Sequence, residues 1–163
     1  MTEIRPAAWP DEVEAVRRLL REYAAGLEVD LSFQDFEGEL AHLPGPYHPA
    51  EGGRFLLAAR AGELVGCVAL RRLGGGRCEM KRLFVRPSAR GEQLGKRLVG
   101  MLCDEARVAG YRQMCLDTLP SMRAAQALYR SLGFRPIAPY VFNPVPGTQY
   151  LGLDLGGSGP PTV

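Results

Sequence analysis

Apolar residues recur along the chain with two periods, about 3.6 residues in some segments and two residues in others. The longer period is typical of helices with one buried face, and the shorter one is typical of half-buried strands. The helical pattern predicts helices at about 13–27, 30–40, 90–109 and 120–132. The alternating pattern predicts strands at 2–6, 54–60, 63–73, 78–85, 111–119 and 148–155, with an irregular strand and loop at 136–147.

The order of these segments indicates how the strands pair. Ala61-Gly62 and Gly74-Gly75-Gly76 join three consecutive strands, which favours an antiparallel meander. The helix at 90–109 then connects two strands, and such a crossover makes its strands parallel. We therefore expect an α/β (α+β) fold with a mixed, mostly antiparallel sheet of about seven strands and helices on both faces.

The stretch from Cys78 to Leu98 contains the most informative pattern. Cys78 and Met80 alternate with Glu79 and Lys81, and the alternation is then lost at 83–85, which indicates a bulge or a strand buried on both faces. Pro87 should end the strand, because it donates no ladder hydrogen bond. The next helix is expected to begin near Arg90.

A helix start that follows a glycine-containing turn is a suitable anion site. Its first N–H groups have no acceptor within the helix, and Gly91 and Gly95 would let a ligand approach the backbone. The surrounding cations could pair with a diphosphate; they are Arg86, Arg90, Lys96 and Arg97. The alternative is tight packing at the glycines and a solvated basic face.

Charge is distributed unevenly along the 163 residues. The segment 71–97 carries nine Lys and Arg against two acids, so its net charge is +7 within a chain of +2. This favours a compact polyanion as ligand over a nucleic acid, and the alternative is again a solvated strand face. With 46% apolar residues the chain can bury one sizeable core, so we expect a single domain at 1–155 and a flexible tail at 156–163.

The cysteines and histidines indicate neither disulfides nor a metal site. Each cysteine lies within an apolar strand or helix pattern, and there is no CxxC pair, export signal or membrane-spanning apolar run. His42 and His48 lie in no zinc-ligand pattern. We expect reduced core thiols, no metal, no membrane association and a cytoplasmic location.

Two motifs in this chain resemble those of the GNAT superfamily of N-acyltransferases. The first is the acyl-CoA turn Gln/Arg-x-x-Gly-x-Gly/Ala, which reads RGEQLG at 90–95 and has Gln93 in place of the middle glycine. The second is Asn-x-x-Ala-x-x-Leu-Tyr-x-x-x-Gly-Phe, which aligns with 122–134 and has Met122 in place of the asparagine. The resemblance covers the chain from the first strand to the last.

This resemblance implies the GNAT fold and transfer of acetyl from acetyl-CoA to a primary amine of a small molecule or peptide. The residues it assigns to the cofactor are Leu83, Phe84, Val85, Arg90, Gly91, Glu92, Gln93, Leu94, Gly95 and Lys96. It also implies that Tyr47 and His48 lie in a loop that edges the acceptor pocket, where an ordinary loop role is the alternative. A homodimer is left open.

Acyl transfer to an amine requires a proton acceptor, an oxyanion donor and a proton for the thiolate. The resemblance assigns the first role to Glu79, for which a strand-face salt bridge is the alternative. It assigns the third to Tyr129, for which a core tyrosine is the alternative. Backbone N–H groups at 83–85 are expected to serve the oxyanion. A catalytically silent acyl-CoA-binding module is the alternative function.

Overall fold

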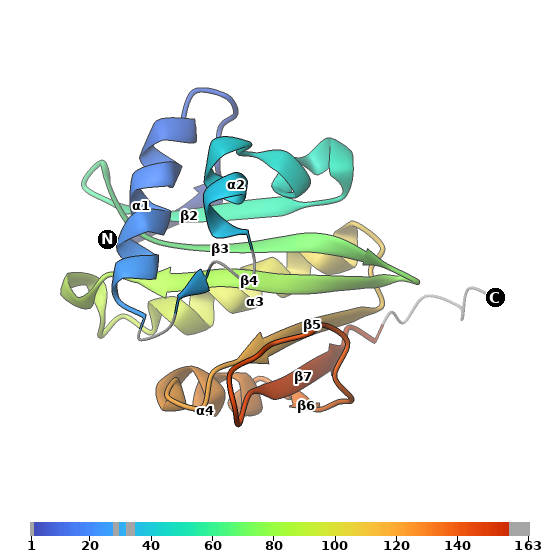
Figure 1. Cartoon of the computed structure of the whole chain (residues 1–163). Helices are drawn as coiled ribbons and strands as arrows, with labels where there is room; N and C mark the ends of the chain where they lie inside the picture. Colours follow the sequence, from blue (N-terminus) through green and yellow to red (C-terminus); the bar gives the residue numbers. More distant parts are fainter. Residues whose placement is uncertain (1, 28–29, 32–34, 157–163) are drawn as a thin grey trace.

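The computed structural model describes residues 2–27, 30–31 and 35–156, and its framework is one twisted sheet of seven strands (Figure 1). The strand order is β1-β2-β3-β4-β5-β7-β6, and only β4 and β5 pair in parallel. The strands are β1 (Thr2–Pro6), β2 (Arg54–Arg60), β3 (Glu63–Gly74), β4 (Arg77–Val85), β5 (Gln113–Thr118), β6 (Arg135–Pro136) and β7 (Gln149–Asp154). The expected mixed, mostly antiparallel sheet is confirmed.

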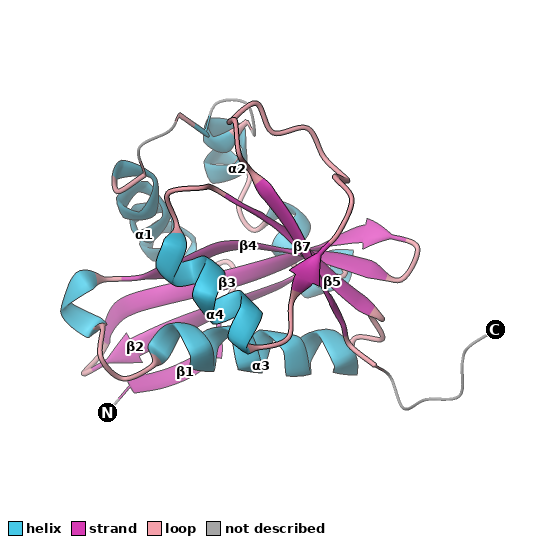
Figure 2. Ribbon diagram, turned by 90° about the horizontal axis from the view of Figure 1, so that it is seen from below, coloured by secondary structure: helices cyan, strands magenta, loops and turns pink. Residues whose placement is uncertain are grey.

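Helices cover both faces of this sheet (Figure 2). One face packs against α1 (Val13–Ala25) and α2 (Phe36–Ala41), and the other against α3 (Leu94–Val108) and α4 (Arg123–Ser131). The alternation of β2 explains this arrangement, because Phe55 and Leu57 are buried toward α1 and α2, while Leu56 and Ala58 are buried toward α3. Single turns of 3-10 helix lie at Gly45–Tyr47, Pro49–Glu51 and Pro87–Ala89.

A β-bulge at Arg82 interrupts β4. Cys67 pairs with Phe84 and Ala69 pairs with Lys81. Two residues of β4 therefore lie between these pairs where β3 has only one. Arg82 takes up the extra step with a left-handed backbone, φ 64°. Of the two explanations that the sequence left open for the lost alternation, the bulge is therefore the one observed.

The bulge shifts the facing of β4 by one residue. Before it, Cys78 and Met80 belong to the core under α3, and after it Leu83 and Val85 pack on that same core. Phe84 faces the other way, with its ring centroid 6.0 Å from that of Tyr23 in α1. The two faces predicted for the first half of the strand are thus correct, and the apolar run at 83–85 has one side chain on the α1 face and two on the α3 face.

The parallel contact between β4 and β5 is short. It extends only over Arg77–Glu79 against Gln113–Cys115, beyond which the two strands diverge. From Met80 onward the edge of β4 that faces β5 has no strand partner among the described residues. A gap therefore opens in the middle of the sheet.

Several predicted boundaries differ from those observed. The helix expected from Arg90 begins at Leu94, because 87–89 form a 3-10 turn and Arg90 is extended. Ser32 and Phe33, assigned to the second helix, lie outside the described residues, as does the predicted tail apart from Gly156.

The four cysteines, Cys67, Cys78, Cys103 and Cys115, are buried free thiols, as predicted. In the described parts of the chain, no helix is both long enough and apolar enough to cross a membrane.

Candidate active site

A groove of about 890 Å³ lies beside the end of β4 and between the starts of α3 and α4. It is called the cofactor groove below. Eight of the ten residues assigned to the cofactor line it: Leu83, Phe84, Val85, Arg90, Gly91, Gln93, Leu94 and Gly95. The turn and the strand end that are adjacent in sequence thus contribute to one surface.

The start of α3 provides backbone donors to this groove. Among the described residues, none accepts a hydrogen bond from the N–H groups of 91–96, and the first acceptor within the helix serves Arg97. Gln93 occupies the N-cap position, but its side chain makes no capping hydrogen bond. Unpaired N–H groups at the positive end of a fifteen-residue helix fit a bound diphosphate.

The backbone of this turn explains most of its glycine pattern. Gly91 has φ 110° with open space where a Cβ would lie, and Gln93, which stands at the motif's middle glycine, has φ 53°. A Cβ on Gly95 would come within 3.4 Å of Leu128 in α4. Gly95 therefore serves close packing of α3 on α4 as well as access to the backbone.

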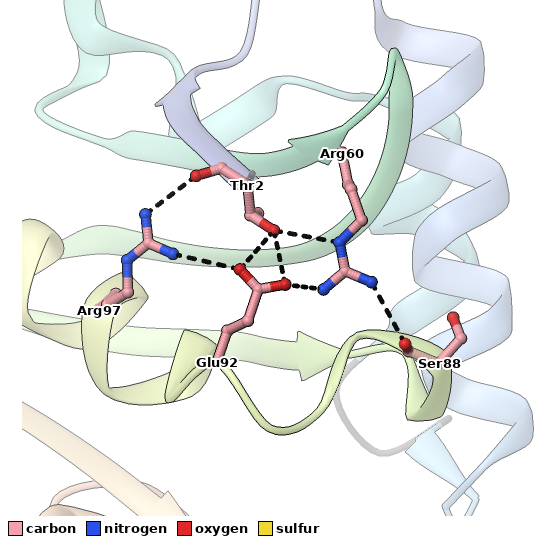
Figure 3. Close-up of polar contacts among 5 residues, drawn as sticks. All are labelled: Thr2, Arg60, Ser88, Glu92 and Arg97. Carbon is pink, nitrogen blue, oxygen red and sulfur yellow. Dashed lines mark hydrogen bonds and ion pairs between the residues drawn. The ribbon is translucent and has the colours of Figure 1, made fainter.

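Glu92 and Lys96, the other two residues assigned to the cofactor, do not line the groove. Glu92 points away from it and accepts hydrogen bonds from the Thr2 hydroxyl and from Arg60 (Figure 3). Arg60 also donates to the Ser88 carbonyl, and Arg97 donates to the Thr2 carbonyl at 2.9 Å. Thr2 and Arg60 lower the pKa of Glu92. This network fastens the turn to the outer strands β1 and β2.

The basic residues around the turn divide into two groups. Arg86 donates hydrogen bonds from Nε and Nη2 to the two carboxylate oxygens of Glu22 in α1, each at 2.8 Å, and Arg97 belongs to the Glu92 network. Arg90 lines the groove and has no ion pair with any described carboxylate. Of these cations, Arg90 is thus the one available to a phosphate in the groove.

The end of β4 also presents backbone donors. Arg86 N–H donates to Val65 O, and Val85 is registered with Gly66, so the antiparallel alternation directs the Val85 N–H away from β3. The expectation that 83–85 leave ladder pairing is correct only for the edge facing β5, because Phe84 and Val85 stay registered with β3.

A narrow passage of about 60 Å³ follows the gap between β4 and β5. It shares Tyr23, Leu27, Leu83 and Met122 with the cofactor groove. Thr118 lines this passage and is 3% exposed. Its hydroxyl is the one fully buried side-chain polar atom of the described residues that has no hydrogen-bond partner. An orphaned polar atom at this place fits a passage that a polar ligand enters.

Tyr129 of α4 lines the same passage and is 5% exposed. Its ring lies 5.7 Å from that of Phe134, and no described residue forms a hydrogen bond with its hydroxyl. Burial raises the pKa of the Tyr129 phenol well above its ordinary value, with smaller contributions from Tyr23 and Asp117. The phenol therefore keeps its proton at neutral pH.

On the other side of the passage lies a second pocket, of about 500 Å³, under α2 and the loop at 141–142. It is called the acceptor pocket below, after the expected place of the acceptor. Glu79 lies in it and is 2% exposed. Its carboxylate accepts hydrogen bonds from Arg71 Nε at 2.7 Å and from the Tyr140 hydroxyl at 2.8 Å. Burial and the neighbouring Glu79 raise the pKa of Tyr140.

The two loop residues expected near the acceptor lie differently. Tyr47 lines the acceptor pocket, whereas the His48 imidazole accepts a hydrogen bond from Ala50 N–H within its own loop. Sequence reasoning did not assign His42, Lys81, Asp117 and Phe142, which also line the pocket. For Lys81 the signal was available, because it lies two residues after Glu79 on the same strand face.

Comparison with known proteins agrees with this arrangement. The model of the acetyltransferase (GNAT) family matches residues 13–134. An uncharacterized N-acetyltransferase of Schizosaccharomyces pombe is 39% identical over 147 residues, covering 90% of each chain. A GNAT-family acetyltransferase of Staphylococcus aureus has a TM-score of 0.76 at 22% identity, covering 95% of this chain and 99% of its own. A phosphinothricin acetyltransferase of Sinorhizobium meliloti, solved in complex with AcCoA, has a TM-score of 0.69 at 18% identity, with coverages of 95% and 89%.

The left-handed backbone at Gln93 leads to a stability prediction. Glycine avoids a steric cost of roughly 1–2 kcal/mol there and loses about 0.5–1 kcal/mol through greater freedom of the unfolded chain. Gln93→Gly should therefore raise the free energy of unfolding by about 0.5–1 kcal/mol, measured by urea titration. Lys96→Gly, on helical backbone three residues later, is the matched control and should lose about 1 kcal/mol. Equal losses in both variants would show that Gln93 is not strained.

Proposed function

The chain belongs to the acetyltransferase (GNAT) family of acetyl-CoA-dependent N-acetyltransferases, and from this premise we propose that it acetylates a primary amine of a small molecule or peptide by direct attack in a ternary complex. The observation that supports this proposal is the path from groove to pocket. The passage shares four lining residues with the cofactor groove, and it shares Lys81 and Asp117 with the acceptor pocket. Two substrates can thus meet at the gap between β4 and β5.

Direct attack is also favoured by what the three cavities lack. None of the four cysteines lines the cofactor groove, the passage or the acceptor pocket, and burial raises the pKa of Cys78 to about 12. A buried protonated thiol is a poor nucleophile, so a covalent acetyl-enzyme has no evident carrier. Membership of an enzyme family sets aside the alternative of a catalytically silent acyl-CoA-binding module.

In this proposal the backbone N–H groups at the start of α3 and the Arg90 side chain hold the diphosphate. The bound acetyl-CoA supplies an activated thioester. The N–H of Val85, directed away from β3, would donate to the carbonyl oxygen as it gains negative charge. A fixed backbone dipole at the edge of the cofactor groove suits this role, because it needs no reorganisation as the charge develops.

Glu79 would accept the proton of the amine, directly or through a water molecule. A primary ammonium has a pKa near about 10, so it must lose a proton before it attacks. The alternative is that Glu79 only stabilises the fold, through Arg71 and Tyr140. The ion pair itself is compatible with both roles, since each carboxylate oxygen has a second lone pair.

Tyr129 would donate its hydroxyl proton to the departing sulfur. The nitrogen–carbon bond forms and the carbon–sulfur bond breaks. Two protons leave the nitrogen by way of Glu79 to solvent, one from the ammonium before attack and one as the amide forms, and one proton passes from Tyr129 to the thiolate. The tyrosine then recovers a proton from solvent, and one proton is released overall. A phenol kept protonated by burial suits the role of acid.

A thiol-release assay with acetyl-CoA and a library of primary amines tests the proposal. We expect at least one amine to accelerate CoA release and to yield its N-acetyl product by mass spectrometry. Initial rates at varied concentrations of both substrates should give intersecting double-reciprocal lines. Parallel lines together with an acetylated protein would contradict direct attack.

Glu79→Gln distinguishes the two roles of Glu79. If Glu79 is the proton acceptor, Glu79→Gln should lower turnover by about a hundredfold or more and leave acetyl-CoA affinity unchanged. Arg71→Gln is the matched control, because it breaks the same ion pair and keeps the carboxylate. Turnover per folded molecule should fall in Glu79→Gln much more than in Arg71→Gln. If the two variants lose turnover equally, Glu79 is a structural residue.

Tyr129→Phe removes only a hydroxyl that no described residue binds. Turnover should fall by roughly ten- to a thousandfold, because the missing interaction forms only as the sulfur gains charge. The melting temperature and acetyl-CoA affinity should change little, since the ring is retained against Phe134. Turnover, melting and calorimetric binding are measured on one preparation. Unchanged turnover with unchanged binding would leave Tyr129 as a core residue.

A further inference from the structure

Two charged side chains, Lys81 and Asp117, line both the passage and the acceptor pocket. We infer that the amine acceptor is a zwitterion, an α-amino acid, whose carboxylate is bound by Lys81 and whose amino group is bound by Asp117. This inference rests on the proposed function and names the substrate class of the same site.

The position of the two residues follows from the sheet. Glu79 and Cys115 are the last registered pair of the parallel strands β4 and β5. Lys81 and Asp117 each lie two residues further along, so they are on the same face of the sheet and on opposite sides of the gap. An acceptor that places its nitrogen in the passage must therefore lie between them.

Lys81 has a positive charge without a close partner. Within the described part of the chain, no carboxylate lies within 4.0 Å of its amine, and the nearby acids are engaged, Glu79 with Arg71 and Glu39 with Arg82. Burial lowers the pKa of Lys81, and Arg82 and Arg71 add to this effect. A bound anion would stabilise the charged form of a half-buried ammonium in such surroundings.

Asp117 is only partly engaged. One of its oxygens accepts a hydrogen bond from the Asn143 amide at 3.0 Å, and the other has no hydrogen-bond partner among the described residues. The Asn143 amide is neutral, and no described cation lies within ion-pair distance of the Asp117 carboxylate. The Asp117 carboxylate can accept hydrogen bonds from the ammonium group of the acceptor before that group loses its proton.

The balance of charges argues against other classes of acceptor. Once Glu39 and Glu79 are paired with arginines, one cation and one anion remain at the junction of passage and pocket. A polyamine would place a second ammonium against Lys81, and a phosphorylated amine would place two negative charges in a pocket lined by four carboxylates, those of Asp35, Glu39, Glu79 and Asp117. A molecule with one charge of each sign matches the site.

The rim of the pocket suits an apolar side chain on this acceptor. Phe142 is 82% exposed and lines the pocket together with Val141 and Pro46. A large aromatic side chain so exposed beside a polar pocket offers contact area to a ligand. We therefore expect apolar α-amino acids to be preferred over acidic and basic ones.

The test compares matched acceptors at saturating acetyl-CoA. Each of leucine, methionine and phenylalanine is assayed beside its carboxamide and the amine that lacks the carboxyl group, such as isoamylamine or phenethylamine. The kcat/KM of the best amino acid should exceed that of its two analogues by about tenfold or more, as expected for a charge-assisted contact. A higher value for the decarboxylated amines or for a diamine would overturn the inference.

Variants of Lys81 test the assignment of the carboxylate contact. Lys81→Met, which keeps an unbranched stem, should raise KM for the amino acid about tenfold to a hundredfold, a much larger change than the change in KM for the decarboxylated amine. Lys81→Arg should restore much of the affinity. Arg18→Met, an exposed cation of α1 that lines none of the three cavities, is the control and should have no effect. Equal losses for both acceptors in Lys81→Met would overturn the contact.

A binding measurement separates this inference from the proposed function. Leucine, methionine and phenylalanine are titrated calorimetrically into protein saturated with CoA, with and without Lys81→Met. Binding that depends on Lys81 supports the zwitterion site even where no acetyl transfer is detected, and that outcome would reject only the proposed reaction. If amines are acetylated but none of the three amino acids shows binding that depends on Lys81, the zwitterion site is rejected and the proposed function is not.

Discussion

At Arg82 one extra residue is accommodated in β4, and both halves of the candidate site depend on it. The left-handed backbone there is held by a buried guanidinium, 3% exposed, that donates two hydrogen bonds to Glu39 of α2 and lies over the rings of Tyr23 and Phe36. Losing either charge would leave the other buried and unpaired, which costs several kcal/mol. The ion pair therefore joins the helix above the acceptor pocket to the strand beside the cofactor groove.

The bulge also separates two functions along one strand. Before Arg82, Glu79 and Lys81 point into the acceptor pocket, and after it Leu83 and Val85 lie beside the cofactor groove. A regular strand would keep alternate residues on one face throughout, so the shift by one residue exchanges the two sets. With β5 diverging beyond Cys115, the same segment exposes a backbone edge to the passage. One local irregularity thus gives a strand that lines both the acceptor pocket and the cofactor groove.

Periodicity and glycine positions were sufficient to predict the order of helices and strands and the glycine-containing turn before α3, because these depend on local sequence. For the lost alternation in β4 they left two possibilities, a bulge or a strand buried on both faces. The direction of Glu92 was not predictable, since it depends on Thr2 and Arg60 from distant strands. The excess of positive charge was likewise ambiguous. Arg82, Arg86 and Arg97 form ion pairs within the fold, whereas Arg90 and Lys81 line cavities and have no ion pair with a described carboxylate. Asp117 escaped notice because its strand meets β4 only in the folded sheet.

Several polar groups without a hydrogen-bond partner among the described residues lie along one path through the molecule. They begin with the N–H groups of 91–96 at the groove, continue with the hydroxyls of Tyr129 and Thr118 in the passage, and end with Lys81 and Asp117 at the pocket. Elsewhere the buried side-chain polar atoms of these residues have partners, so the cost of leaving groups unpaired is concentrated where ligands would supply the missing hydrogen bonds. Each ligand that binds would then satisfy its own segment of the path. The fold is therefore expected to be more stable with both substrates bound than with one, since ligands that bind only the native state add their binding free energies to its stability.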